Sequence, residues 1–316
     1  MDTRIHGKGL MRALLPAVLA AGLATGCGGG GGGDDGGGGG GGGLPGLVTV
    51  PTSLVNVDRN MAVNLVNSLG MVSDNASPSS PGLSSAGAAS GGTVRPAFSP
   101  GGTTSCPGGG SVTVTHPGGD PTTGPEVTTF NNCTDAVGNV TTGQIILNAA
   151  DTTGVSAEWN MFKIAFAGAG YLLLHGDISS TIQSAPPLTR VSSTIDSLQI
   201  QSQFPGEPVA AFLVTNATTT TVTDSNAMTY TTSYTYTLAS NLWNGAVQVA
   251  TVMNMDLVTN FGDSFPSSGQ VKITGANGTQ ALITFNGNQT VRVQIDEDGD
   301  GNFDFDQTYT WTDLGG

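Results

Sequence analysis

Basic residues are scarce in this chain of 316 residues. Nine Lys and Arg stand against 23 Asp and Glu, which gives a formal net charge of −14. Nucleic acids and anionic lipid surfaces attract proteins through clustered Lys and Arg. We therefore expect no nucleic-acid partner and no adsorption to an anionic membrane surface. An acidic balance of this kind is typical of solvated extracytoplasmic proteins and of proteins that bind cations.

Residues that commonly carry catalysis are also few. Two histidines, His116 and His175, lie beyond the first 30 residues. Neither belongs to a nucleophile, metalloprotease or dithiol motif, since the patterns G-x-S-x-G, H-E-x-x-H and C-x-x-C are absent. Each histidine is either a general base or a satisfied or solvated side chain, and the second interpretation is the simpler. The sequence therefore favours a protein without enzymatic activity.

Long apolar runs and abundant aromatic residues are missing as well. The apolar stretch from Ala13 to Ala24 holds about a dozen residues, whereas a membrane-spanning helix needs about 20. Aromatic residues make up 6% of the chain. Outer-membrane β-barrels usually carry aromatic girdles at both interfaces. The sequence thus disfavours a transmembrane helix and a membrane-embedded barrel alike.

Cys27 ends a segment that has the parts of an export signal. Small residues, Ala24-Thr25-Gly26, precede the cysteine, and a basic region precedes the apolar stretch. The basic residues are Arg4, Lys8 and Arg12. Residues 1–26 resemble the signal peptide of bacterial lipoproteins, whose lipobox places small residues before an invariant Cys. The resemblance implies cleavage before Cys27, a diacylglycerol on its thiol and a formal net charge of −16 for the mature chain.

Residues 27–43 are predicted to be a lipidated cysteine followed by a glycine-rich tether. Fourteen glycines follow Cys27, interrupted only by Asp34 and Asp35. Glycine loses more conformational freedom on ordering than any other residue, so this stretch is a flexible spacer. Gly28 in place of Asp favours the outer membrane under the sorting rule of enterobacterial lipoproteins. The periplasmic and cell-surface faces of that membrane both stay open.

The chain after the tether divides into three parts. Residues 44–72 are predicted to hold a short helix with Asp58 as its N-cap, because apolar residues follow at helical spacing. Residues 73–105 are Ser, Gly, Ala and Pro with almost no large apolar side chains, which predicts a disordered linker. Residues 106–316 follow a different pattern.

Residues 106–316 alternate apolar and polar side chains, which predicts an all-β domain. Val271 and Ile273 alternate with polar neighbours, as do Val291, Val293 and Ile295. Turn residues separate about eleven to thirteen such runs. Short connections favour antiparallel neighbours, so we expect an antiparallel meander that forms a barrel or a sandwich.

Three tyrosines, Tyr230, Tyr234 and Tyr236, share one face of a predicted strand. Together with Trp159 and Trp243 they either line a binding face for sugars or peptides or belong to the core. Alternation with Thr favours the core.

Cys106 and Cys133 remain as one even pair once Cys27 is lipidated. In an oxidising compartment this pair predicts a disulfide. The bridge would close a loop of about 28 residues and stabilise the fold by about 3–4 kcal/mol in the chain-entropy model. A metal site is the alternative, although no other Cys or His lies at a ligand spacing.

The stretch from Asp296 to Asp306 holds six acidic residues in eleven positions. Its D-x-D-x-D-G-x-x-D pattern resembles the first nine positions of EF-hand calcium loops. The predicted calcium ligands are Asp296, Asp298, Asp300, the Asn302 carbonyl, Asp304 and Asp306. Gln307 stands where the family places a bidentate Glu, and strands flank the loop, so the likeness is confined to the loop. The alternative is a polar hairpin turn whose acids are solvated.

These observations predict a lipid-anchored outer-membrane protein with a non-catalytic structural, adhesive or ligand-binding role and a structural calcium ion. The membrane would be contacted through the N-terminal lipid, and a protein or glycan partner stays open. The alternative function is a β-barrel carrier of a lipid or other apolar ligand. Its interior would be lined by Leu172, Leu174, Phe212 and Met253.

Overall fold

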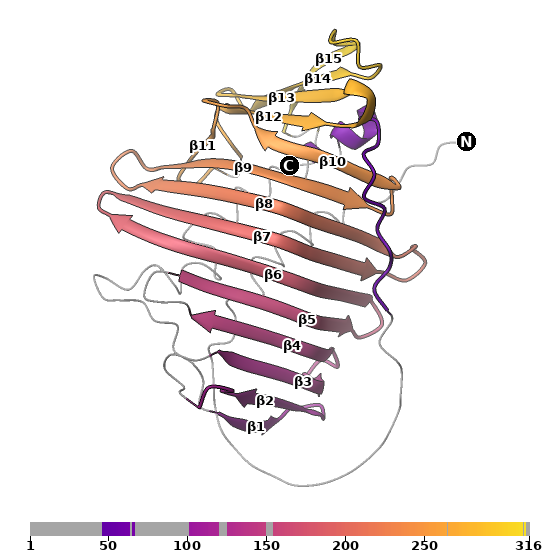
Figure 1. Cartoon of the computed structure of the whole chain (residues 1–316), viewed down its shortest axis with the longest axis vertical. Helices are drawn as coiled ribbons and strands as arrows, with labels where there is room; N and C mark the ends of the chain where they lie inside the picture. Colours follow the sequence, from indigo (N-terminus) through magenta and orange to yellow (C-terminus); the bar gives the residue numbers. More distant parts are fainter. Residues whose placement is uncertain are drawn as a thin grey trace.

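The computed structural model describes residues 46–63, 65–66, 101–119, 125–149, 154–263, 265–311 and 313. Fifteen strands of this described part form one sheet, accompanied by a short N-terminal helix and the 3₁₀ turn η1 (Ala276–Gly278) (Figure 1). The strands are β1 (Gly102–Ser105), β2 (Ser111–Thr115), β3 (Glu126–Thr134), β4 (Val140–Ala149), β5 (Gly154–Phe166), β6 (Gly170–Ala185), β7 (Leu188–Gln203), β8 (Ala210–Asp224), β9 (Thr229–Ser240), β10 (Gly245–Thr251), β11 (Leu257–Asn260), β12 (Gly269–Thr274), β13 (Gln280–Asn286), β14 (Thr290–Asp296) and β15 (Phe305–Thr310). The predicted signal peptide, the tether and residues 67–100 of the predicted helical segment and linker lie outside the described residues.

The sheet is an antiparallel meander, as the alternation predicts. Each strand from β1 to β10 pairs with its neighbour in sequence, β10 pairs with β12, and the path continues to β15, while β11 pairs with β9. The path is open, with β1 at one edge and β15 at the other, so the sheet does not close into a barrel in the described part of the chain. The β-region begins at Gly102 rather than at Cys106, because β1 occupies the last residues of the predicted linker.

One face of the sheet carries the main hydrophobic core. Side chains that alternate along β9, β12 and β14 are buried there, including Tyr234, Ile273 and Val293. Trp159 is buried in the same core, and Tyr236 and Trp243 are partly buried against it. The core interpretation is therefore confirmed for Trp159 and Tyr234 and in part for Tyr236 and Trp243, whereas Tyr230 is buried outside this cluster and stacks on Phe261.

A line of β-bulges crosses the long strands. The register shifts in five strand pairs, β3–β4, β4–β5, β5–β6, β6–β7 and β8–β9. Residues with positive φ mark the line on β3, β4, β5, β6 and β8: Asn132, Gly143, Met161, Gly176 and Asn216. Each bulge adds an unpaired residue, bends its strand and increases the local twist. Because the bulges are aligned, they bend the sheet as a whole.

The N-terminal segment packs on the sheet, although it is far away in sequence. Residues 46–57 cross the ends of β6 to β10 as an extended strap, seen in indigo in Figure 1. The backbone N–H of Val48 donates to Gln201 Oε1 at 2.9 Å, and Gln199 Nε2 donates to the Val48 carbonyl at 2.8 Å. Val50 packs on Ala239 and small neighbours, on the face opposite the main core.

Two glycines let the strap approach the sheet closely. A Cβ on Gly245 would meet the Val55 side chain, and a Cβ on Gly275 would meet the Val55 carbonyl oxygen. The strap then hydrogen-bonds to both neighbouring elements, since Val55 N–H donates to the Ala246 carbonyl at 3.0 Å and Ala276 N–H donates to the Val55 carbonyl at 2.8 Å. A side chain at either glycine would therefore push the strap away.

The predicted helix follows the strap. Its described residues are 59–63 and 65–66, and Asp58 caps it, because Asp58 Oδ1 accepts the Met61 N–H at 2.8 Å. The cap prediction is confirmed. Met61, Leu65 and Val66 are buried in the main core between the helix and the sheet. Within the described ranges, no helix has the length and apolar character needed to span a membrane.

The predicted disulfide is present. Cys106 and Cys133 are bonded, with their Cα atoms 5.4 Å apart. Cys106 directly follows the edge strand β1, and Cys133 lies in β3. The bridge therefore fastens the edge hairpin of the sheet across β2.

The carrier alternative assigned four residues to a ligand cavity. Leu172, Leu174 and Phe212 are buried in the main core, where they pack with other side chains. Met253 is 84% exposed, so its prediction as an interior residue is wrong. Met253 lies in the turn after β10, where the apolar alternation of that strand no longer sets its direction.

The bulge line predicts a specific glycine requirement. Gly143 has φ +95°, and a Cβ there would overlap the Met161 carbonyl oxygen on β5. We expect Gly143→Ala to lower the free energy of unfolding by at least about 1–3 kcal/mol, measured by urea denaturation.

Gly287→Ala is the matched control. A Cβ at Gly287 would lie 3.7 Å from the nearest atom, the Ser267 carbonyl oxygen, and the residue has no positive φ. This variant should unfold at nearly the same urea concentration as the native protein. Equal loss of stability in both variants would show that the bulge geometry is not the cause.

Candidate metal centre

The acidic loop connects the last two strands of the sheet. Asp296 is the final residue of β14, and β15 begins at Phe305. Arg292 and Gln294 precede the loop on β14, and they pair with Thr308 and Asp306 on β15 in the antiparallel register. The loop is thus the turn of an edge hairpin, in agreement with the sequence prediction.

Asp296 organises this turn from a fully buried position. Its exposed fraction is 0%. Asp296 Oδ1 accepts the Gly299 N–H at 2.7 Å, and Oδ2 accepts the Gly301 N–H at 3.0 Å and Gln280 Nε2 at 3.2 Å. Both glycines have positive φ, which other residues rarely adopt. The carboxylate therefore supports the shape of the loop through three hydrogen bonds from within the chain.

Three of the predicted ligands converge. Asp296, Asp298 and Asp304 each place one carboxylate oxygen within 4.8 Å of the other two. Asp296 is buried, while Asp298 and Asp304 are exposed. Asp304 is held by the loop itself, because its Oδ2 accepts the Glu297 N–H at 2.9 Å. We call this group the aspartate triad.

Asp300 and Asn302 pair with each other beside the triad. Asp300 Oδ1 accepts the Asn302 N–H at 2.7 Å, and Oδ2 accepts Asn302 Nδ2 at 3.1 Å. These two hydrogen bonds lower the pKa of Asp300 below its usual range. The structure therefore places Asp300 at the rim of the loop and not within the converging oxygens.

Asp306 has a different partner. It lies on β15, and its carboxylate accepts hydrogen bonds from Arg292 Nε at 2.7 Å and from Arg292 Nη2. Gln294 Nε2 adds a third at 3.3 Å. Hydrogen bonding from the guanidinium lowers the pKa of Asp306. The sequence prediction assigned Asp306 to the metal, whereas the structure uses it as a cross-strand ion pair.

The donor set of the triad suits a hard cation. Carboxylate oxygens are the ligands that Ca²⁺ prefers, at about 2.3–2.6 Å, and oxygens within 4.8 Å of one another can share one such ion. Three carboxylates near each other also repel, and a cation between them relieves that repulsion. Soft metals are disfavoured, because the triad offers neither sulfur nor imidazole nitrogen.

The loop also contacts the N-terminal helix. Arg59 Nε lies 3.9 Å from Glu297 Oε1, and the Arg59 guanidinium lies 4.1 Å from the centroid of the Phe305 ring. Asn277 Nδ2 in η1 donates to Asn56 Oδ1 at 3.0 Å. The hairpin turn, η1 and the start of the helix are therefore joined at one end of the core.

The two histidines lie in different parts of the sheet. His116 follows β2, and its Nε2 lies 3.8 Å from Glu126 Oε2, with both side chains buried. His175 lies on β6 opposite Gln199 of β7. Sequence reasoning missed the His116–Glu126 pair, because Glu126 is separated from His116 by a connection that no motif marks.

Comparison with protein-family models, with curated proteins and with solved structures returned no match for this chain. Its function is therefore inferred from its own residues.

The Asp306–Arg292 pair generates a pH-dependent prediction. A carboxylate whose pKa is lower in the folded state stabilises the fold above its unfolded pKa of about 3.9, and that stability is lost as the pH falls through the folded pKa. We expect Asp306→Asn to reduce stability at neutral pH and to have a progressively smaller effect as the pH falls below about 3.9, measured by urea denaturation at each pH. When Asp306→Asn is introduced into the Arg292→Gln variant, its effect on stability should not depend on pH in this way. A stability difference between the native protein and Asp306→Asn that is the same at every pH would contradict the assignment of Asp306 to an ion pair with Arg292.

Proposed function

We propose that this chain is a lipid-anchored outer-membrane lipoprotein with a non-catalytic structural, adhesive or ligand-binding role. The observation that carries the proposal is Cys27 behind its lipobox-like segment. Support for a tethered domain comes from the strap, since Val48 hydrogen-bonds to Gln201 of the sheet and 18 residues separate Cys27 from Gly46, where the strap begins. A glycine-rich segment of that length has a typical reach of about 20–25 Å.

A non-catalytic role is supported by the chemistry of the sheet. Charged residues make up 10% of the sequence, and long strands such as β8 and β9 are rich in threonine. The side chains of such strands present hydroxyl groups, and few of them are acids or bases that could take part in catalysis. This composition suits a surface that is displayed to other molecules.

We further propose that the aspartate triad binds a structural calcium ion. Support comes from the convergence of Asp296, Asp298 and Asp304 in a loop that resembles a calcium loop in sequence. The ion would join the edge hairpin more firmly to η1 and the N-terminal helix. Its role would be to stabilise that end of the core.

Lipidation is tested by metabolic labelling with an alkyne analogue of palmitate in a bacterial host. We expect the native protein to be labelled and to sediment with the outer membrane. Cys27→Ala should lose the label. Gly28→Asp should move the protein toward the inner membrane under the enterobacterial sorting rule.

The control is the double variant Cys106→Ala/Cys133→Ala, which removes the other two cysteines and should keep the label. Label retained in Cys27→Ala, or absent from the native protein, would refute the lipoprotein proposal. This test does not depend on calcium.

Calcium binding is tested by thermal unfolding of the mature chain with calcium and with chelator. At a calcium concentration about a hundredfold above Kd, bound ligand stabilises a fold by about 2.7 kcal/mol, which raises Tm by about 5–10 °C for a domain of this size. Asp298→Ala and Asp304→Ala should abolish this rise.

Asp306→Asn is the matched control, because it removes an acid from the same hairpin but not from the triad. Its calcium-dependent rise in Tm should equal that of the native protein. No rise in the native protein would mean that the loop is a solvated turn.

A further inference from the structure

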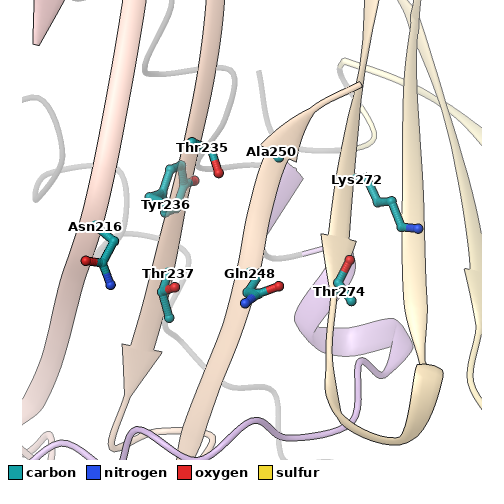
Figure 2. A pocket seen from close by; sticks show the side chains of 8 residues that line it. All are labelled: Asn216, Thr235, Tyr236, Thr237, Gln248, Ala250, Lys272 and Thr274. Carbon is teal, nitrogen blue, oxygen red and sulfur yellow. The ribbon is translucent and has the colours of Figure 1, made fainter. Parts of the chain in front are cut away.

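A polar groove of about 350 Å³ lies on the face of the sheet opposite the main core (Figure 2). Its walls come from β8, β9, β10 and β12. Along β12, Lys272 and Thr274 line the groove, while Val271 and Ile273, which alternate with them, point into the core. The alternation of the strands therefore directs mainly polar side chains to this face, while Tyr236, which packs partly against the core, also lines the groove.

The groove is built from two rows that cross three strands. Thr237, Gln248 and Thr274 form one row in register, and Thr235, Ala250 and Lys272 form the next. Side chains directly opposite each other on neighbouring strands lie about 4.5–5.5 Å apart at Cβ. Ala250 is short, so the second row has a gap at its centre.

Asn216 closes the groove at the β8 end. It has φ +51° and lies where the register of β8 and β9 shifts between Thr215 and Thr218. A bulge leaves one residue out of the ladder and redirects its side chain. The bulge line that bends the sheet thus also supplies a wall of the groove.

The polar side chains of the groove do not bond to one another. Elsewhere on the sheet such groups pair, as in Gln270 Nε2 to Thr284 Oγ1 at 3.1 Å and Thr221 Oγ1 to Thr232 Oγ1 at 3.2 Å. In the described part of the chain, the side chains that line the groove form no hydrogen bond to protein atoms. Those side chains are Asn216, Thr235, Thr237, Gln248, Lys272 and Thr274. Their donors and acceptors are available to a molecule in the groove.

Lys272 gives the groove its charge. Three other cations have partners: Arg292 pairs with Asp306, Arg59 approaches Glu297, and Lys163 lies 4.6 Å from the centroid of the Tyr171 ring. Arg190 on β7 does not line the groove. Among the described residues no ion pair joins Lys272 to an acid. The chain has a formal net charge of −14. An exposed ammonium group without an acidic partner attracts an anionic group of a ligand to this place on the surface.

We propose that this groove binds a short saccharide that carries a carboxylate, an inference that rests on the proposed ligand-binding role. Thr hydroxyls and Asn and Gln amides both donate and accept hydrogen bonds, as the hydroxyls of a sugar do. The Lys272 ammonium group pairs with the carboxylate. A volume of about 350 Å³ lies at the lower end of the usual range of small-molecule sites and suits one to a few sugar rings.

Other ligand classes fit the groove less well. An apolar ligand would cover the six polar side chains and leave their donors and acceptors without partners, which is unfavourable. A cationic ligand would meet Lys272. A neutral sugar would use the hydroxyl and amide groups but would leave the ammonium group unpaired.

The test is isothermal titration calorimetry of the mature chain in detergent with trigalacturonate and, separately, with maltotriose. We expect trigalacturonate to bind more tightly than neutral maltotriose. A charge-assisted hydrogen bond that is lost weakens binding by about tenfold or more, so Lys272→Gln should bind trigalacturonate about tenfold more weakly. Gln248→Ala should weaken both saccharides.

Lys163→Gln is the matched control. It removes the same charge from the same protein, at a lysine that lies over the Tyr171 ring and outside the groove. Its affinity for trigalacturonate should equal that of the native protein. Equal weakening in both lysine variants, or no binding of either saccharide by the native protein, would overturn the proposal.

The result is separable from the tests of the proposed function. Lipid labelling at Cys27 and the calcium-dependent Tm do not involve the groove. Labelling without saccharide binding would therefore remove only the groove assignment. Saccharide binding without labelling would leave the groove assigned and remove the lipid anchor.

Discussion

The apolar face of one continuous sheet has to be removed from water, and the rest of this structure depends on how that is done. Burial of apolar surface is the main favourable term in folding. All fifteen strands of the described chain belong to the same sheet, and one cluster of buried apolar side chains extends across its strands. The N-terminal helix contributes Met61, Leu65 and Val66 to this cluster. The line of bulges bends the sheet, and the docked N-terminal segment covers part of its apolar face.

The shape of the sheet also determines where the groove and the acidic loop lie. The bulge at Asn216 interrupts the ladder between β8 and β9 and supplies one wall of the groove on the outer face. At the other end of the core, η1 and the start of the helix contact the last hairpin, and Asp296 is buried while Asp298 and Asp304 of its loop are exposed. The strap is hydrogen-bonded to the sheet from Val48 onward, and this fixes the point from which any preceding tether leaves the folded domain.

Local patterns in the sequence predict much of this structure, and the reasons are physical. Alternation identifies strands such as β12 and β14, because one face of the sheet is buried and the other is not. Asp58 is recognisable as an N-cap because capping involves only nearby backbone groups. The bulges are not recognisable, since an extra residue at Met161 or Asn216 has meaning only relative to the register of the neighbouring strand.

The same distinction explains the candidate sites. Spacing alone cannot separate Asp306 from the triad, because its pairing with Arg292 follows from the β14–β15 register. The two sites also differ in how their polar groups are satisfied. Asp296 already accepts three hydrogen bonds from within the chain, so a cation would enter a loop whose shape is set. The groove side chains have no such internal bonds, so a ligand there has to supply the partners itself. Affinity at the triad thus depends on charge, whereas affinity at the groove depends on matching hydrogen bonds around Lys272.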